Sequence, residues 1–358
     1  MKQNHNNYLR LAFNIAQVNL GRTKTNPSVG CVVVKNNSVI SSGCTSLNGR
    51  PHAEFNALNK NKNFKNSDLY VTMEPCDHHG LTPPCTKIII RKGINRVYYS
   101  FDDIDIRTVK KGKKKLIKNK IKVYKKRIKD FSNFYQSYFL ISENKIPLID
   151  AKIAISKDFF TVNQSSKWIT NSFSRKRTHL IRSRYDAIVS TSKSINKDNS
   201  VLNCRIKGLD NNKPDLVIID LNLKIKKTLE IFKKPSRRKI YIVTSIFDKK
   251  KFSYFKKKKI EIIRINTLKE KDDFINFFKI LKKRSYNRIL IESGLIFLNQ
   301  LLKNKLISNL YIFQSPVKLG KIGKNNTSNY LIKKFKLKNR IKVNLSNDNL
   351  YKLELNNV

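Results

Sequence analysis

The sequence has no long hydrophobic run. Its N-terminus, Met-Lys-Gln-Asn-His, lacks the apolar stretch of a signal peptide. No segment approaches the ~18 apolar residues that are needed to span a bilayer. These absences predict a cytoplasmic protein without a membrane partner. The 5 cysteines are an odd number in such a chain, so we expect metal binding or burial rather than a disulfide framework.

Acidic residues are also scarce, at 25 Asp and Glu against 75 Lys and Arg, which gives a formal charge of +50. Taken alone, this charge would indicate nucleic acid or an anionic membrane surface. The excess is spread over the whole chain, however, and it accompanies few glycines and prolines and abundant Asn, Ile and Phe. We attribute it to compositional drift that leaves lysine head groups in water. We therefore expect no nucleic-acid partner, and a surface that favours a phosphorylated small substrate.

At 358 residues, of which 40% are hydrophobic, the chain is long enough for two domains. The first half alternates helical and strand patterns around a hairpin through Asn36-Asn37. Helices are predicted at 8–20, 53–60, 86–92 and 111–119, and strands at 29–35, 39–42, 68–74, 96–101 and 121–124. The polar, proline-marked segment 144–147 is the predicted boundary, which gives domains 1–145 and 146–358.

The second half also alternates strands with helices, which predicts a second α/β domain on a largely parallel sheet. We expect antiparallel strands near 309–314 and at the C-terminus. The other predicted strands are 148–156, 187–191, 216–220, 240–245, 260–265 and 288–292.

The pattern that carries chemistry is Pro51-His52-Ala53-Glu54, then Glu74-Pro75-Cys76, then Pro83-Pro84-Cys85. One imidazole and two thiolates are a natural set for a tetrahedral zinc whose fourth position stays open to water. We therefore predict His52, Cys76 and Cys85 as zinc ligands. Glu54 is predicted to take the proton of that water and to pass it to a departing amine.

The spacing of the two thiolates departs from the H-x-E and P-C-x-x-C signature of zinc deaminases. Eight residues, 77–84, separate Cys76 from Cys85. This predicts a deaminase subclass with an insertion between its thiolates. We expect His78 and His79, which lie in the insertion, to be loop or substrate contacts rather than metal ligands.

These residues resemble the bifunctional riboflavin-biosynthesis family, in which a pyrimidine deaminase is fused to a reductase. The matching text of the first domain is Asn26 to Cys31, Gly49 to Glu54, Tyr70 to Cys76 and His78 to Cys85. The resemblance implies a cytidine-deaminase-like α/β/α domain followed by a dihydrofolate-reductase-like α/β domain. It also implies zinc and NADPH as cofactors, a phosphorylated pyrimidine as substrate, a homodimer, and Asn26 as a substrate contact.

In the second domain the resemblance covers Lys152 to Asp158, Ser166 to Thr170, Glu292 to Gly294 and Pro316 to Gly320. It implies two sets of site residues. The cofactor set is Ile155, Trp168, Ser194, Asp198 and Gly294. The substrate set is Ser166, Arg182, Leu202, Arg205 and Glu292. A glycine turn after a strand lets backbone N–H groups approach a dinucleotide phosphate, and the two arginines offer forked donors to a substrate phosphate.

Four positions depart from the family pattern. Thr45 stands where a histidine is usual, and 103–106 replaces an Asp-Pro-Asn-Pro loop. Phe159-Phe160 replaces Gly-Arg, and 198–200 replaces Asp-Asp-Pro. The first two would reshape the pocket without touching the metal, whereas two bulky rings beside a cofactor turn would obstruct binding.

Four readings follow. The leading one is a bifunctional enzyme that deaminates the phosphoribosylaminopyrimidine and then reduces its ribosyl group with NADPH. A variant of it is a deaminase with an inactive reductase domain. A rival, from the shared His-Ala-Glu and the charge, is a nucleic-acid deaminase. A non-enzymatic alternative is a protein whose zinc is purely structural, in which replacement of Glu54 has no consequence.

Overall fold

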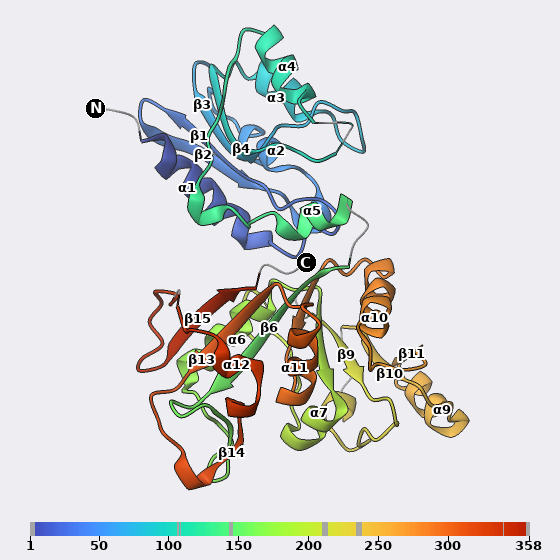
Figure 1. Cartoon of the computed structure of the whole chain (residues 1–358). Coiled ribbons are helices and arrows are strands. Elements are labelled where there is room, and N and C mark those ends of the chain that lie inside the picture. Colours follow the sequence, from blue (N-terminus) through green and yellow to red (C-terminus); the bar gives the residue numbers. More distant parts are fainter. Residues whose placement is uncertain are drawn as a thin grey trace. The chain divides into compact units, whose positions relative to one another are not determined.

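The computed structural model describes residues 4–105, 107, 109–142, 146–209, 214–233, 238–338 and 340–355. The chain forms two compact units, Met1–Lys145 and Ile146–Val358 (Figure 1). Each unit is described separately below. None of the helices in the described part of the chain combines the length and the apolar character needed to cross a bilayer.

The first unit is built on a five-stranded sheet in the order β2-β1-β3-β4-β5. β1 pairs antiparallel with β2 and β3, and β3, β4 and β5 are parallel. The strands are β1 (Gly30–Lys35), β2 (Ser38–Cys44), β3 (Asp68–Met73), β4 (Arg96–Phe101) and β5 (Lys122–Lys125). The helices are α1 (His5–Ala16), α2 (Ala53–Leu58), α3 (Cys85–Arg91), α4 (Lys111–Lys118) and α5 (Gln136–Ser142).

Two features of this unit confirm the sequence patterns. The hairpin between β1 and β2 turns through Asn36 and Asn37, whose φ angles are 49° and 61°. Asparagine tolerates this left-handed region, which a tight hairpin requires. The periodic apolar residues of α1 face the core, and its buried side chains are Leu9, Ala12, Phe13 and Ala16.

Glycines at close approaches show that α1 and α2 cover opposite faces of this sheet. A β-carbon at Gly30 would lie 1.9 Å from the carbonyl oxygen of Ala12 in α1. One at Gly43 would lie 2.6 Å from that of Ala53 in α2. Gly43 pairs with Cys31, the neighbour of Gly30, and neighbouring residues of a strand point to opposite faces. The unit is therefore an α/β/α sandwich.

The second unit contains an eight-stranded sheet in the order β11-β10-β9-β8-β12-β6-β13-β15. Its strands are β6 (Leu148–Ile155), β8 (Ala187–Thr191), β9 (Asp215–Ile219), β10 (Ile240–Thr244), β11 (Glu261–Arg264), β12 (Arg288–Ile291), β13 (Asn309–Gln314) and β15 (Asn349–Glu354). Every neighbouring pair is parallel except β13 and β15.

The prediction of antiparallel strands near 309–314 and at the C-terminus is confirmed for the pair that these two strands form. β13 runs antiparallel to β15 but parallel to β6. A separate two-stranded sheet, β7 (Phe160–Asn163) with β14 (Gly323–Asn326), was not predicted. Its strands are short and half-exposed, so they carry no hydrophobic alternation.

Helices cover both faces of the large sheet. They are α6 (Ser172–Arg182), α7 (Ser192–Asp198), α8 (Glu230–Lys233), α9 (Lys249–Lys257), α10 (Lys271–Lys283), α11 (Leu295–Lys303) and α12 (Leu331–Lys334). Ile289 and Ile291 of β12 pack with α10 and α11, whereas Leu290 between them packs with α6 and α9. A parallel sheet buried on both faces accounts for the nearly continuous apolar runs of its strands.

Candidate zinc centre and reductase site

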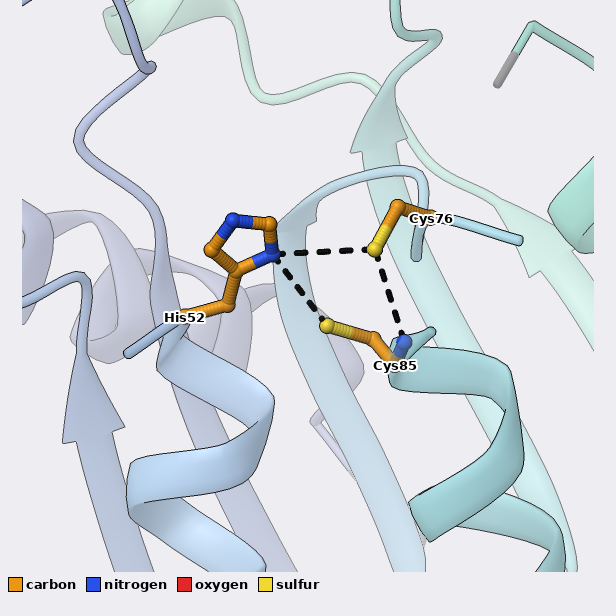
Figure 2. Close-up of side chains that lie close together, drawn as sticks. All are labelled: His52, Cys76 and Cys85. Carbon is orange, nitrogen blue, oxygen red and sulfur yellow. Dashed lines mark hydrogen bonds between the residues drawn. The ribbon is translucent and has the colours of Figure 1, made fainter. Parts of the chain in front are cut away.

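Three side chains from separate segments of the first unit converge on one point. His52 immediately precedes α2, Cys76 follows β3, and Cys85 begins α3. One ligand atom of each lies within 4.8 Å of the others. The Nδ1 atom of His52 is 3.6 Å from the sulfur of Cys76 and 3.4 Å from that of Cys85 (Figure 2). Zinc bonds of ~2.3 Å to sulfur and ~2.0 Å to nitrogen in a tetrahedron place these atoms about 3.6 Å apart. The spacing fits zinc.

The two thiols differ in how readily they ionise. A hydrogen bond with the Cys85 thiol, together with the His52 imidazole, lowers the pKa of Cys76 to about 4. The same contact and burial raise the pKa of Cys85. The backbone N–H of Cys85, at the start of α3, also points at the sulfur of Cys76 at 3.4 Å. One thiolate is thus ready for a cation, and coordination deprotonates the second outright.

Glu54 lies beside this group, two residues after His52 on α2. Its carboxyl is buried and is hydrogen-bonded to Cys85. Burial, and next the charge of Cys76, raise the pKa of Glu54 to about 7. A carboxyl with a pKa near neutrality accepts and releases a proton with little driving force lost in either direction.

The other residues that the sequence singled out in the first unit have contacts of their own. Asn26 donates from its amide to the carbonyl oxygen of Gly49 at 3.0 Å, three residues before His52. Within the described residues, His78 and His79 are not part of the metal-ligating group. Thr45 is buried, and its hydroxyl accepts the N–H of Val29 at 2.9 Å. The Thr45 hydroxyl therefore binds the backbone just before β1.

The loop 103–106, which differs from the Asp-Pro-Asn-Pro of the family, is stabilised by the contacts of its own aspartates. Asp103 accepts hydrogen bonds from the Tyr138 hydroxyl at 2.7 Å and from the N–H of Asp105 at 3.1 Å. Asp105 pairs with Arg107, which lowers the pKa of Asp105 to about 2. Ile106, the last residue of that loop, lies outside the described residues.

In the second unit, Ser194, Glu292 and Gly294 follow the carboxyl ends of the adjacent strands β8 and β12, and Ile155 ends the next strand, β6. This is where ligands bind in open parallel sheets. Ser194, in the first turn of α7 after β8, and Gly294, in the turn after β12, are brought together, since the Gly294 N–H donates to the Ser194 hydroxyl at 3.0 Å. Gly294 is also the N-cap of α11 and has no side chain to cap that helix, and the N–H groups at a helix start favour an anion. Ile155 ends β6 and is fully buried.

Trp168 is exposed to 51% and lies outside the core. The guanidinium of Arg175 stands 4.7 Å from the centre of its ring, a cation–π contact. Ser166 accepts the Trp168 N–H at 3.2 Å. Asp198 ends α7 at the surface, within electrostatic reach of Lys152.

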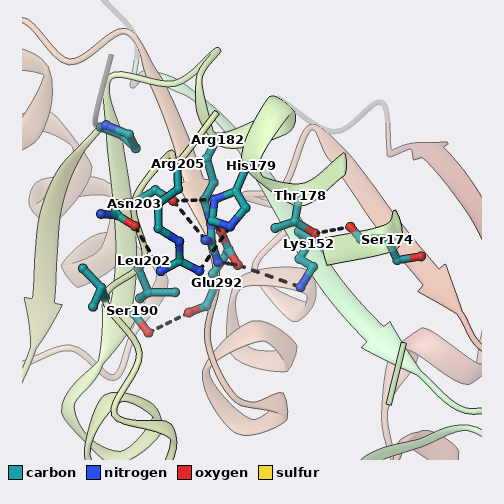
Figure 3. A network of polar contacts seen from close by, with 12 residues as sticks. Lys152, Ser174, Thr178, His179, Arg182, Ser190, Leu202, Asn203, Arg205 and Glu292 are labelled. Atoms are coloured by element: carbon teal, nitrogen blue, oxygen red, sulfur yellow. Dashed lines mark hydrogen bonds and ion pairs between the residues drawn. The ribbon is translucent and has the colours of Figure 1, made fainter. Parts of the chain in front are cut away.

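A charged network joins β6, the last residue of α6 and the residue that follows β12 (Figure 3). Arg182 donates two bonds to the carboxylate of Glu292, at 2.6 and 2.9 Å. The Lys152 amine lies 3.9 Å from the same carboxylate. Burial raises the pKa of Glu292, but Arg182 and Lys152 outweigh it and the net shift is downward. Burial lowers the pKa of Lys152.

Leu202 and Arg205 lie on the irregular segment that follows α7. Leu202 is buried with a positive φ of 50°, and its carbonyl oxygen accepts a bond of 2.6 Å from Arg238. Arg205 is exposed, and its guanidinium lies 3.2 Å from the Nε2 atom of His179. The two arginines therefore differ, because Arg182 is committed to Glu292 whereas Arg205 reaches solvent.

Sequence reasoning missed His179, Asn203 and Arg238, and it treated Lys152 only as part of a matching strand. One signal was available for His179. It stands three residues before Arg182, and residues at this spacing share one face of a helix. Asn203 and Arg238 contribute through a loop without periodicity, so no sequence signal pointed to them.

Comparison with known proteins agrees with this geometry. Residues 2–101 match the cytidine and deoxycytidylate deaminase zinc-binding region, and residues 147–351 match the RibD C-terminal domain. The riboflavin biosynthesis protein RibD of Buchnera aphidicola is 32% identical, over 88% of each chain. That of Aquifex aeolicus is 30% identical, over 88% of this chain and 87% of its own.

Solved structures agree along the whole length. A Thermotoga maritima diaminohydroxyphosphoribosylaminopyrimidine deaminase/5-amino-6-(5-phosphoribosylamino)uracil reductase superimposes with a TM-score of 0.80, at 25% identity, and covers 98% of each chain. RibD of Acinetobacter baumannii shares the fold, with a TM-score of 0.79. The chain therefore belongs to the RibD family and is a bifunctional enzyme of riboflavin biosynthesis, a zinc-dependent deaminase joined to an NADPH-dependent reductase.

Proposed function

We propose that unit 1–145 is the pyrimidine deaminase, with His52, Cys76 and Cys85 as its zinc ligands and Glu54 as its proton carrier. The observation that carries this proposal is the convergence of the three ligand atoms within 4.8 Å beside a buried carboxyl. A structural zinc site has four protein ligands, and the described residues offer three at this point. This favours a catalytic site over a purely structural one.

When bound, zinc supplies a nucleophilic water at neutral pH. Glu54 removes a proton from that water and delivers it to the departing amine, so that the ring carbon gains oxygen and ammonia leaves. Burial of Glu54 supports this role, because a pKa of about 7 suits both transfers. Asn26 is proposed to orient the substrate at the mouth of the site.

The proposed substrate is 2,5-diamino-6-(ribosylamino)-4(3H)-pyrimidinone 5'-phosphate, after the activity named for the Thermotoga maritima protein. The proposed product passes to the reductase in unit 146–358. When bound, NADPH supplies the hydride that converts the ribosyl group to a ribityl chain. What this unit contributes is alignment of the two reactants, which removes several kcal/mol of barrier.

Residues at the carboxyl ends of the strands are proposed to divide this work. The cofactor contacts are Ile155, Trp168, Ser194, Asp198 and Gly294. The substrate contacts are Ser166, Arg182, Leu202, Arg205 and Glu292. Because Arg182 is paired with Glu292, we assign the substrate phosphate mainly to Arg205, and the sugar hydroxyls to Glu292 and its partner Arg182.

The positions of Phe159 and Phe160 support an active reductase. Phe159 packs against the hydrophobic core of the unit, and the ring of Phe160 covers Gly323 of the facing strand. Both rings thus have packing partners of their own. We propose that they replace the Gly-Arg of relatives without closing the cofactor turn.

A coupled assay tests both halves in one sample. Purified protein should hold about one zinc per chain, release ammonia from the pyrimidine and then oxidise NADPH. Active protein without zinc would overturn the deaminase assignment. Ammonia release without NADPH oxidation, even with the deaminated intermediate supplied, would leave a deaminase with an inactive second unit.

We further propose a cytoplasmic homodimer that does not act on nucleic acid. A phosphorylated metabolite as substrate supports the location, and dispersal of the basic residues along the chain supports the absence of a nucleic-acid partner. Light scattering tests the dimer and cell fractionation tests the location. A tight, salt-sensitive RNA complex would contradict the last point.

A further inference from the structure

His179 contacts both the guanidinium of Arg205, the proposed phosphate ligand, and the backbone of the loop that carries Arg205 (Figure 3). Its Nδ1 atom lies 2.8 Å from the carbonyl oxygen of Asn203, and its Nε2 atom lies 3.2 Å from Nη2 of Arg205. A carbonyl oxygen only accepts, so Nδ1 carries the hydrogen. A guanidinium only donates, so Nε2 is the acceptor. The two contacts together require a neutral imidazole in one tautomer.

The charges around His179 maintain this neutral form. Burial lowers the pKa of His179, and Arg182 on its own helix and Arg205 on the facing loop lower it further. The hydrogen bond with the Asn203 carbonyl and the carboxylate of Glu292, at the end of β12, act in the opposite direction. The net shift is downward, so the ring is neutral at neutral pH.

The loop that presents Arg205 has a fixed backbone. The carbonyl oxygen of Asn203 also accepts from Arg182 at 3.1 Å. Arg238 bonds to the carbonyl oxygens of Val201 and Leu202. The backbone at Arg205 is therefore fixed, whereas its exposed guanidinium contacts His179 closely and the Asn203 side chain at 3.5 Å.

We propose that His179 is a positioning residue of the reductase, which aims the guanidinium of Arg205 at the phosphate monoester of the substrate. This inference rests on the phosphate role proposed above for Arg205. A guanidinium held in place loses less freedom when it binds a phosphate, so the fork is ready before the substrate arrives. Protonation of His179 turns the acceptor into a donor and releases Arg205.

Two variants of His179 test the proposal. His179→Leu removes both contacts, whereas His179→Gln retains an amide oxygen near the position of Nε2. We expect His179→Leu to raise the reductase KM for the phosphorylated intermediate about tenfold, the effect of losing one hydrogen bond to a charged group. The KM for the dephosphorylated intermediate should stay within about twofold by the same reasoning, and His179→Gln should recover most of the loss. Deaminase activity of the same samples reports that the chain is folded.

Arg205→Ala separates this inference from the proposal beneath it. If Arg205→Ala does not raise the KM for the phosphorylated intermediate, the phosphate role of Arg205 fails. If Arg205→Ala raises it and His179→Leu does not, only the role of His179 fails. Equal effects of His179→Leu on both substrates would also overturn it, because they would indicate general disturbance. The double variant should be no worse than Arg205→Ala alone, since the two residues act in series.

A pH profile gives a readout that a merely structural role would not change. The ratio of the KM of the wild type to that of His179→Gln cancels titration of the substrate phosphate, whose second pKa is ~6. We expect this ratio to rise as the pH falls below the ordinary histidine pKa of ~6.5. A ratio that stays flat down to the acid limit of the enzyme's stability would contradict control of Arg205 by His179.

Discussion

Gly112 lies directly against the carbonyl oxygen of Pro75, so that a β-carbon at Gly112 would sit 1.9 Å from that oxygen. Pro75 precedes the proposed zinc ligand Cys76, and Gly112 is the second residue of α4. Glu74 strengthens the same contact, because its carboxylate accepts the N–H groups of Lys110 and Lys113, each at 3.1 Å. The start of α4 thus supports the loop of one metal ligand.

The first prediction concerns this contact. Gly112→Ala should move α4 away from Pro75 and lower the free energy of unfolding by about 1–3 kcal/mol, as for other overpacked sites. It should also weaken zinc binding, because Cys76 would move with its loop. Competition with a chromophoric chelator measures the zinc affinity. Lys114→Ala, on the exposed side of α4, is the control and should leave the affinity unchanged. Equal affinities of the two variants would contradict the coupling.

A second prediction separates metal binding from proton transfer. Glu54→Gln preserves the size and burial of the side chain but cannot carry the proton, so zinc content should stay near one per chain while ammonia release falls by about 10²–10⁴-fold. The reductase activity of the same chain, assayed with the deaminated intermediate, is the internal control. Full deaminase activity in Glu54→Gln would remove Glu54 from the mechanism.

The zinc centre could be predicted from the sequence because short motifs contain its ligand residues. The residue types and order of His52, Cys76 and Cys85 limit the possible chemistry even though their distances are unknown. The hairpin at Asn36-Asn37 was equally readable, since the turn itself demands residues that accept a positive φ.

Contacts between segments that are distant in the sequence could not be predicted from it. β13 lies between β6 and β15 and runs parallel to the first and antiparallel to the second, but its own alternation would be the same in any of these pairings. The contact between His179 and Arg205 depends on an irregular loop, and the support of Pro75 by Gly112 depends on how a helix docks. Periodicity describes one element at a time, so it carries no information on such pairs.

The third prediction concerns Asp158, which ties the turn after β6 to the segment 315–322. Its carboxylate accepts the N–H groups of Leu319, at 3.0 Å, and Gly320, at 2.8 Å. Asp158→Ala should therefore accelerate hydrogen exchange at these two amides, while amides within β12 keep their protection. Unchanged exchange at Leu319 and Gly320 would show that the segment is held by other contacts.

The same carboxylate gives a pH dependence with a definite sign. Burial raises the pKa of Asp158, but hydrogen bonds from Ser156 and from the N–H groups of Gly320 and Leu319 outweigh it and lower the pKa to about 2. An acid with a lowered pKa stabilises the fold above its unfolded pKa of ~3.9 and loses this contribution as the pH falls from there through 2. Asp158→Asn should show a shallower loss of stability across this interval, measured by thermal unfolding at a series of pH values.

A final prediction tests how Phe160 is accommodated in place of the usual arginine. A β-carbon at Gly323 would lie 2.4 Å from the ring of Phe160, and the φ of Gly323, −78°, is one that any residue adopts. Gly323→Ala should therefore destabilise the second unit by about 1–3 kcal/mol through overpacking alone. Phe160→Ala opens the space that the new methyl group needs, so the double variant should cost less than the sum of the two single variants. Urea unfolding followed by fluorescence measures this, because Trp168 is the one tryptophan of the chain and reports on this unit. If the destabilisations of the two single variants added strictly, the ring of Phe160 would move aside freely. Such a ring would be mobile enough to obstruct the turn beside Asp158. The proposed activity of the reductase would then lose its structural support.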